Sequence, residues 1–183
     1  MNKIFISTAS FAEYDKSPVS ILEEKGLKVA LNPYGRTLTK EEIVHFLDGV
    51  IGLIAGTEVL NKEVLSSAHS LKVISRCGAG MDNIDLKVAE ILGIKVFNTP
   101  DAPTLAVAEL TIGLIFALLR RLVEADSSIR EGKWKKYMGS LLHNKKVGII
   151  GLGRIGKKVS ELLIPFGIEI LSCEPNPDKY FVN

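Results

Sequence analysis

Residues 146–156 read KVGIIGLGRIG and decide the fold of this chain. An apolar strand runs directly into the pattern G-x-G-x-x-G, and the pattern opens an amphipathic helix expected over residues 155–164. This order is typical of a dinucleotide-binding turn: Gly151 makes the tight turn, Gly153 lets the backbone approach a pyrophosphate, and Gly156 lets the helix pack on the strand. The pyrophosphate of such a ligand lies at the positive end of the helix dipole.

The residues that follow this helix agree with the same interpretation. A second strand is expected at residues 169–172, and a dinucleotide-binding unit needs an acidic residue after it to hold the ribose hydroxyls. Glu174 stands at that place. A carboxylate there repels a 2′-phosphate, and residues 175–178 offer no arginine to hold one, so the sequence favours NAD over NADP. The alternative is a strand-to-helix turn that needs its glycines only for packing.

The first 98 residues alternate short apolar segments with amphipathic ones, which predicts an α/β domain with a parallel sheet. The near-continuous hydrophobicity of the strands predicts that they are buried on both faces. We expect strands at residues 3–7, 28–31, 50–54, 71–75 and 95–97, and helices at 19–25, 40–47, 61–68 and 86–92. The fold class is therefore α/β: a flavodoxin-like doubly wound domain over residues 1–98, then the first, incomplete part of a Rossmann NAD-binding domain within residues 99–183.

A second glycine-rich segment, residues 75–85, reads SRCGAGMDNID and follows an expected strand. It therefore lies at the carboxyl edge of the first sheet, where doubly wound proteins bind ligands. Its backbone N–H groups and Arg76 are suited to an anion such as a carboxylate or a phosphate. Asp82 and Asp85 also suit a simple helix-capping role, which is compatible with binding.

Residues 106–121 predict a helix that is apolar nearly all round. Such a helix is normally buried, and here the burial would be between domains or in a subunit interface.

Composition excludes several other classes of function. Apolar residues make up 46% of the 183, charged residues 24%, and the net charge is +2, so nothing asks for nucleic acid or a membrane surface. Cys77 and Cys173 are expected to be buried free thiols rather than a disulfide or a metal pair. The N-terminus reaches polar residues too early for a signal peptide, so we expect a cytoplasmic protein, and no metal site is predicted.

Five blocks of the sequence resemble the D-isomer-specific 2-hydroxyacid dehydrogenases, and most closely their phosphoglycerate dehydrogenases. In the family's order and spacing, they are residues 75–85, 93–100, 106–114, 132–134 and 151–156. The resemblance implies hydride transfer between NAD and C2 of a small 2-hydroxy or 2-oxo acid. It implies a substrate-binding N-terminal domain, an NAD-binding domain that carries the glycine turn, and a homodimer in which the apolar helix takes part.

The resemblance also implies roles for individual residues. The loop Cys77, Gly78, Ala79 and Gly80 contacts the substrate carboxylate through backbone amides beside Arg76, and Ala79 lies near the nicotinamide. For the cofactor, the expected residues are Ala79, Thr104, Gly151, Gly153, Arg154, Ile155, Gly156 and Glu174. Thr104 matches a hydroxyl residue near the cofactor, Arg154 and Ile155 match the backbone pair at the pyrophosphate, and Glu174 stands where the family usually has Asp.

Two departures from the family qualify this interpretation. No residue here matches the family's catalytic arginine, glutamate or histidine. His45 and His69 are expected on surface helices and His143 in the loop before residue 146, so no catalytic residue is assigned. The loop at residues 54–59 reads IAGTEV and lacks the arginine of the phosphoglycerate enzymes, which disfavours a phosphorylated substrate.

Two hypotheses follow. Either the chain is part of such an enzyme, cut within the NAD-binding domain and inactive alone, or it is a non-catalytic homologue that acts as a nucleotide-binding or oligomerisation module.

Overall fold

The computed structural model describes residues 2–176, which form two compact units that divide between Pro100 and Asp101. Each unit has its own sheet and its own apolar core. Pro177 and Asp178, which enter the expectation about NADP, lie outside the described residues.

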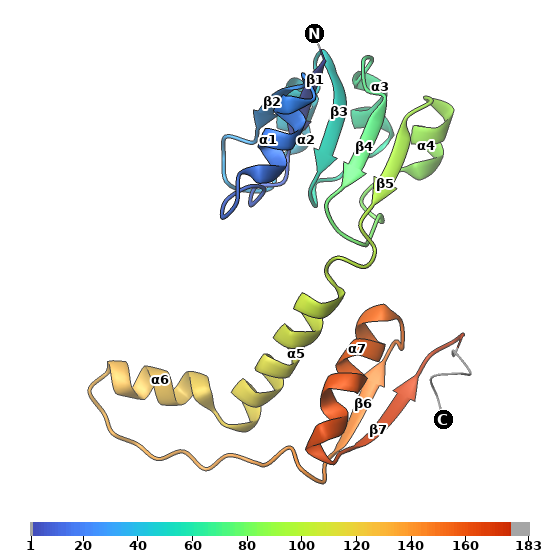
Figure 1. Cartoon of the computed structure of the whole chain (residues 1–183). Helices are drawn as coiled ribbons and strands as arrows, with labels where there is room; N and C mark the ends of the chain where they lie inside the picture. The colour runs from blue at the N-terminus through green and yellow to red at the C-terminus, as the bar shows by residue number, and fades with distance from the viewer. Residues whose placement is uncertain (1, 177–183) are drawn as a thin grey trace. The chain divides into compact units, whose positions relative to one another are not determined.

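The first unit is a five-stranded parallel sheet flanked by helices (Figure 1). Its strand order, β2-β1-β3-β4-β5, is the flavodoxin-like order of a doubly wound sheet, so the predicted fold class is confirmed. The elements are β1 (Lys3–Ile6), α1 (Ser17–Glu24), β2 (Lys28–Leu31), α2 (Lys40–Phe46), β3 (Val50–Ala55), α3 (Lys62–Ser67), β4 (Val73–Arg76), α4 (Leu86–Ile91) and β5 (Lys95–Asn98). All five expected strands and all four expected helices are present.

The core of this unit lies along the three central strands. Leu53 of β3 is in register with Phe5 of β1 and Ile74 of β4, and all three side chains are buried. The expectation that every strand is buried on both faces is wrong for the edge strands β2 and β5. Leu31 and Phe97 are exposed there, because an edge strand has one neighbouring strand and the helices cover it less completely.

Helix α2 begins with a capping box. The Thr39 hydroxyl accepts a hydrogen bond from the Glu42 N–H, and the Glu42 carboxylate accepts one from the Thr39 N–H. Arg36 donates to both oxygens of the same carboxylate, at 2.7 and 2.8 Å. These contacts, the Arg36 hydrogen bonds first, lower the pKa of Glu42 to about 2.

The second unit contains one strand–helix–strand motif and two further helices. The elements are α5 (Thr104–Leu119), α6 (Leu122–Arg130), β6 (Lys146–Ile150), α7 (Arg154–Leu163), a short 3-10 turn (Ile164–Phe166) and β7 (Glu169–Cys173). Strands β6 and β7 pair in parallel, with Lys146 opposite Glu169 and Ile150 opposite Cys173. Helix α5 packs on α7, and Ala108 and Leu163 are fully buried in the small core between them.

Within the described part of the second unit, the apolar helix α5 is buried along the face that packs on α7. Leu110, Leu114 and Leu118 on another face are 61%, 55% and 79% exposed. Burial of this open face by a second copy of the chain stays a prediction. Among residues 2–176, no helix is both long enough and apolar enough to cross a bilayer.

Two expectations about single residues are wrong. Cys77 and Cys173 are free, as expected, but exposed rather than buried, because Cys77 lies in the loop after β4 and Cys173 ends a strand with one neighbour. His69 lies beyond the end of α3 instead of on it, although it is exposed as expected. His45 and His143 are also exposed.

Candidate functional site

The glycine turn between β6 and α7 has the geometry that its sequence predicts. Gly151 has φ +90°, a conformation that disfavours any residue with a side chain. Its N–H donates to Cys173 O at 2.8 Å, which ties the turn to the end of β7. A Cβ at Gly156 would lie 2.2 Å from Gly151 O, so only glycine lets the first turn of α7 come this close to the strand.

The N-terminus of α7 is open to a ligand. Gly153 is its N-cap residue, and a Cβ built there would meet no atom within 4 Å. No side chain caps the helix at this position. Arg154 and Ile155 come next, and the first amides of a helix have no intrahelical acceptor. Within residues 2–176 their N–H groups are therefore available to donate to an anion.

Glu174 is anchored to the glycine turn. Its Oε2 accepts a hydrogen bond from Leu152 N–H at 2.8 Å, and its Oε1 accepts one from Asn176 N–H at 3.3 Å. An ionised carboxylate has about four acceptor positions, so two remain for further donors such as ribose hydroxyls. The structure therefore brings together the three glycines and the acidic residue that the sequence singles out.

Thr104 and Arg154 line a shallow pocket of about 290 Å³ beside this turn. The Thr104 hydroxyl oxygen is buried and has no hydrogen-bond partner in the described structure. The Arg154 side chain forms an ion pair with Asp101, with Nε 2.6 Å from Oδ1. Asp101 is a neighbour that the sequence analysis does not assign to the site.

In the first unit, the loop of residues 77–80 is held by the ends of two strands. Cys77 N–H donates to Ala55 O at 2.9 Å, and Gly78 N–H donates to Thr99 Oγ1 at 2.9 Å. Asn98 Nδ2 donates to Ala79 O at 2.7 Å.

These contacts leave part of the loop available to a ligand. Within residues 2–176, the N–H groups of Ala79 and Gly80 have no partner, and they are the loop amides free to bind a carboxylate. Thr99 and Asn98 position the loop. The sequence analysis gives them no role, although both belong to a block that carries the family resemblance.

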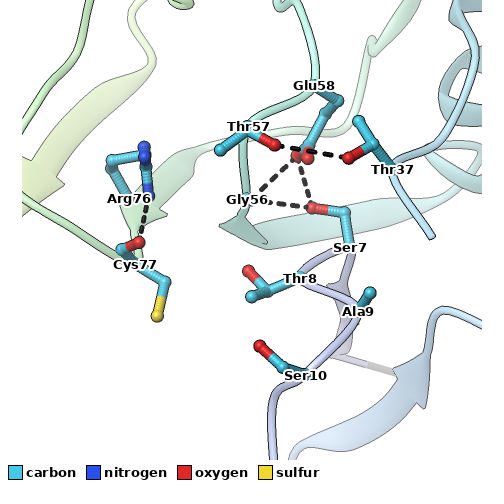
Figure 2. A pocket seen from close by; sticks show the side chains of 10 residues that line it. All are labelled: Ser7, Thr8, Ala9, Ser10, Thr37, Gly56, Thr57, Glu58, Arg76 and Cys77. Atoms are coloured by element: carbon cyan, nitrogen blue, oxygen red, sulfur yellow. Dashed lines mark hydrogen bonds between the residues drawn. The ribbon is translucent and has the colours of Figure 1, made fainter. Parts of the chain in front are cut away.

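A pocket of about 260 Å³ opens beside this loop at the carboxyl ends of β1, β3 and β4 (Figure 2). Hydroxyl side chains supply much of its lining. The lining residues are Ser7, Thr8, Ala9, Ser10, Thr37, Gly56, Thr57, Glu58, Arg76 and Cys77. Of these, the sequence analysis assigns Arg76 and Cys77 to the site. The others lie in three separate loops, after β1, before α2 and after β3, and only the folded sheet shows that they meet.

Glu58 is the unexpected member of this pocket. It is 2% exposed, and its Oε1 accepts hydrogen bonds from Ser7 Oγ and, at 3.1 Å, from Gly56 N–H. Arg76 also lies at the pocket, where it donates through Nη1 to Cys77 O, and its Nε is buried without a partner in the described structure. Among residues 2–176, no three His, Cys, Asp or Glu side chains gather into a metal-binding cluster.

Comparison with known proteins identifies relatives of one dehydrogenase family. Residues 5–174 match the family model described as D-isomer specific 2-hydroxyacid dehydrogenase, catalytic domain. The chain is 40% identical to human D-3-phosphoglycerate dehydrogenase over 158 residues, which are 85% of this chain and 29% of that protein. It is 38% identical to hydroxypyruvate reductase from Thermotoga maritima over 141 residues, which are 75% of this chain and 46% of that protein.

A solved structure of NAD⁺-bound 3-phosphoglycerate dehydrogenase from Entamoeba histolytica superimposes with a TM-score of 0.77 at 28% identity. The match covers 97% of this chain and 56% of that one. The chain therefore spans less than half the length of the two curated relatives, and little more than half of the solved one.

Proposed function

The chain belongs to the D-isomer specific 2-hydroxyacid dehydrogenase family, and we propose that it takes part in NAD-dependent hydride transfer at C2 of a small 2-hydroxy acid. In this proposal the second unit holds the cofactor and the first unit holds the substrate. The relatives support the reaction class, and the geometry of the two loops supports these assignments.

The observation that carries the proposal is the glycine turn. Gly153 faces open space, and the N–H groups of Arg154 and Ile155 have no partner within residues 2–176. At position 156, glycine is the residue type that fits against Gly151. A turn that needed glycine only for packing would explain Gly151 and Gly156. It would not explain the glycine at position 153, where a side chain would meet no protein atom. The residues present therefore fit the pyrophosphate of a dinucleotide.

Each cofactor-binding residue has a distinct task in this proposal. The N–H groups of Arg154 and Ile155 donate to the pyrophosphate, and Glu174 accepts hydrogen bonds from the ribose hydroxyls. The unpartnered hydroxyl of Thr104 supplies a further polar contact. When bound, NAD would supply the hydride acceptor of the reaction, and the family resemblance assigns Ala79 to the nicotinamide.

Glu174 also sets the choice between NAD and NADP. A 2′-phosphate brought to this carboxylate would place like charges together, so NAD should bind more tightly, by about tenfold or more. Calorimetry with the 183-residue chain tests this with NAD and NADP side by side. Glu174→Ser should reduce the preference, whereas Glu131→Ser, at the exposed end of α6, should not change it. Equal binding of the two cofactors by the unaltered chain would contradict the assignment.

For the substrate, we propose that the Ala79 and Gly80 amides and Arg76 hold the carboxylate. Cys77 and Gly78 contribute shape, because their own N–H groups are already bonded within the protein. In both units, backbone N–H groups without a protein acceptor would donate hydrogen bonds to an anion.

We further propose that the 183-residue chain alone does not turn over substrate. The family resemblance assigns no catalytic arginine, glutamate or histidine to residues 2–176, and losing general acid–base catalysis alone costs a factor of about 10² to 10⁴. The test is an NADH-linked assay on the pure chain with several 2-oxo acids. Turnover at the rate of a working enzyme would refute this part of the proposal.

A second candidate function is a non-catalytic nucleotide-binding or oligomerisation module. The open apolar face of α5, at Leu110, Leu114 and Leu118, favours it, because a face of this kind is typical of a protein interface. Stable self-association together with NAD binding and no turnover would support this second function.

A further inference from the structure

The pocket of the first unit contains a buried carboxylate that the reaction does not need. Glu58 lies in the loop after β3, and its carboxylate points toward Ser7 and Gly56 in the pocket wall (Figure 2). A Cβ at residue 56 would lie 2.9 Å from Glu58 Oε2, so Gly56 makes room for this carboxylate. Burying an ionised group is costly, and such a group needs several donors to offset its lost hydration.

Residues 2–176 supply two such donors to Glu58. Oε1 accepts from Ser7 Oγ and from Gly56 N–H. Oε2 accepts no hydrogen bond from residues 2–176, although a carboxylate offers about four acceptor positions. An oxygen with unused acceptor positions in a pocket wall is suited to a ligand that brings a hydrogen-bond donor.

The other polar groups of the pocket suit a hydroxyl ligand better than a phosphate. Thr37 and Thr57 place their hydroxyls 3.3 Å apart, and the Thr8 hydroxyl is buried without a partner in the described structure. Hydroxyls both donate and accept, as a ligand hydroxyl does. Arg76 is the one cation among the lining residues, and its Nη1 is already bonded to Cys77 O.

The negative charge of Glu58 also disfavours a phosphate in this pocket. A phosphate in a pocket of this size would bring about two negative charges close to the Glu58 carboxylate, and their repulsion is strong where water is partly excluded. Arg76 would offset only part of that repulsion while it also holds the substrate carboxylate. The pocket therefore favours a neutral group that donates a hydrogen bond.

We propose that Glu58 is a specificity-determining residue, which selects a 2-hydroxy acid carrying a hydroxyl group beyond C2 and excludes one carrying a phosphate there. This inference rests on the proposed function, because it takes the pocket to be the substrate site. It identifies the substrate class as small, unphosphorylated, polyhydroxylated acids.

Three acids with the same C1 and C2 test the idea: D-lactate, D-glycerate and D-3-phosphoglycerate carry a methyl, a hydroxymethyl and a phosphorylated hydroxymethyl group. Each is titrated into the ¹⁵N-labelled 183-residue chain, and the amide shifts of Ser10, Gly56 and Cys77 report binding in the pocket. We expect D-glycerate to bind about tenfold more tightly than D-3-phosphoglycerate and several-fold more tightly than D-lactate.

Two variants separate charge from shape. Glu58→Gln keeps the shape and the Oε1 acceptor but removes the charge. The gap in affinity between D-glycerate and D-3-phosphoglycerate should therefore narrow to within about threefold. Glu24→Gln, an exposed position at the end of α1, makes the same chemical change and should leave the gap unchanged. If Glu58→Gln does not fold, the order of the three acids on the unaltered chain still decides the question.

The outcomes distinguish this inference from the proposed function. Tighter binding of D-3-phosphoglycerate than of D-glycerate, with the same pocket amides shifting, would overturn the role of Glu58 and leave the proposed function standing. An unchanged gap in Glu58→Gln would overturn it as well. No shift at the pocket with any of the three acids would contradict the substrate site itself, and the inference would fail with it.

Discussion

Replacing Gly156 by alanine should destabilise the second unit through a single contact. The new methyl carbon would lie 2.2 Å from Gly151 O and 3.2 Å from Gly151 C, whereas a carbon–oxygen contact needs about 3.3 Å. Because both atoms are backbone, α7 must move away from β6 by about 1 Å. Overpacking of this kind costs about 1–3 kcal/mol, and the higher helix propensity of alanine offsets up to about 1 kcal/mol. A net loss of about 1–2 kcal/mol lowers Tm by roughly 5–15 °C for a unit of this size.

Gly153→Ala is the matched control, because it makes the same chemical change three residues earlier. Its methyl group would meet nothing within 4 Å, and φ −71° with ψ −165° suits any residue, so the loss of stability should be about 0.5 kcal/mol. The same methyl group would stand where a pyrophosphate approaches, so NAD binding should weaken although the fold is kept. Thermal unfolding followed by circular dichroism, with NAD calorimetry on each variant, makes the comparison. Equal losses of Tm in the two variants would refute the reasoning.

Two further predictions concern other parts of the chain. The pKa of Glu42 is held at about 2, below its ordinary value of 4.5, chiefly by Arg36. The contact therefore stabilises the fold fully above about pH 4.5, and this stabilisation is lost as the pH falls through about 2. A carboxyl NMR titration of Glu42 with a midpoint near 4.5 would count against this prediction. If a second copy of the chain covers α5, sedimentation should show a dimer. Leu114→Asp should convert this dimer to a folded monomer, because Leu114 is half-exposed in the single chain. A wild-type chain that stays monomeric at every concentration would contradict this prediction.

The fold could be predicted because local signals and overall pattern agree in this sequence. Each strand of the first sheet is a short apolar segment, and each helix between them is amphipathic, so the alternation indicates a parallel sheet. The capping box of Thr39 and Glu42 is also a local feature, because it depends only on residues three positions apart. Burial of the edge strands could not be predicted in this way, because strand order is a long-range property.

The candidate site could be predicted in part for the same reason. The glycine turn and the loop at residues 77–80 are continuous segments, so their sequence carries their geometry. The pocket around Glu58 is different, because Ser7, Gly56 and Arg76 lie at or just beyond the ends of three strands and meet through the sheet order. The lack of an arginine in the loop at residues 54–59 is visible in the sequence, but the burial of Glu58 depends on the folded sheet.

The central claim is that the N-terminus of α7 binds the pyrophosphate of NAD, and an amide titration tests it most directly. ¹⁵N spectra of the 183-residue chain are recorded as NAD is added. We predict that the largest shifts fall on Gly153, Arg154 and Ile155, with a dissociation constant on the order of hundreds of micromolar or weaker, because the contacts given by one strand–helix–strand motif are modest. Shifts that are absent from these three amides at millimolar NAD, or that are largest elsewhere in the chain, would contradict the account.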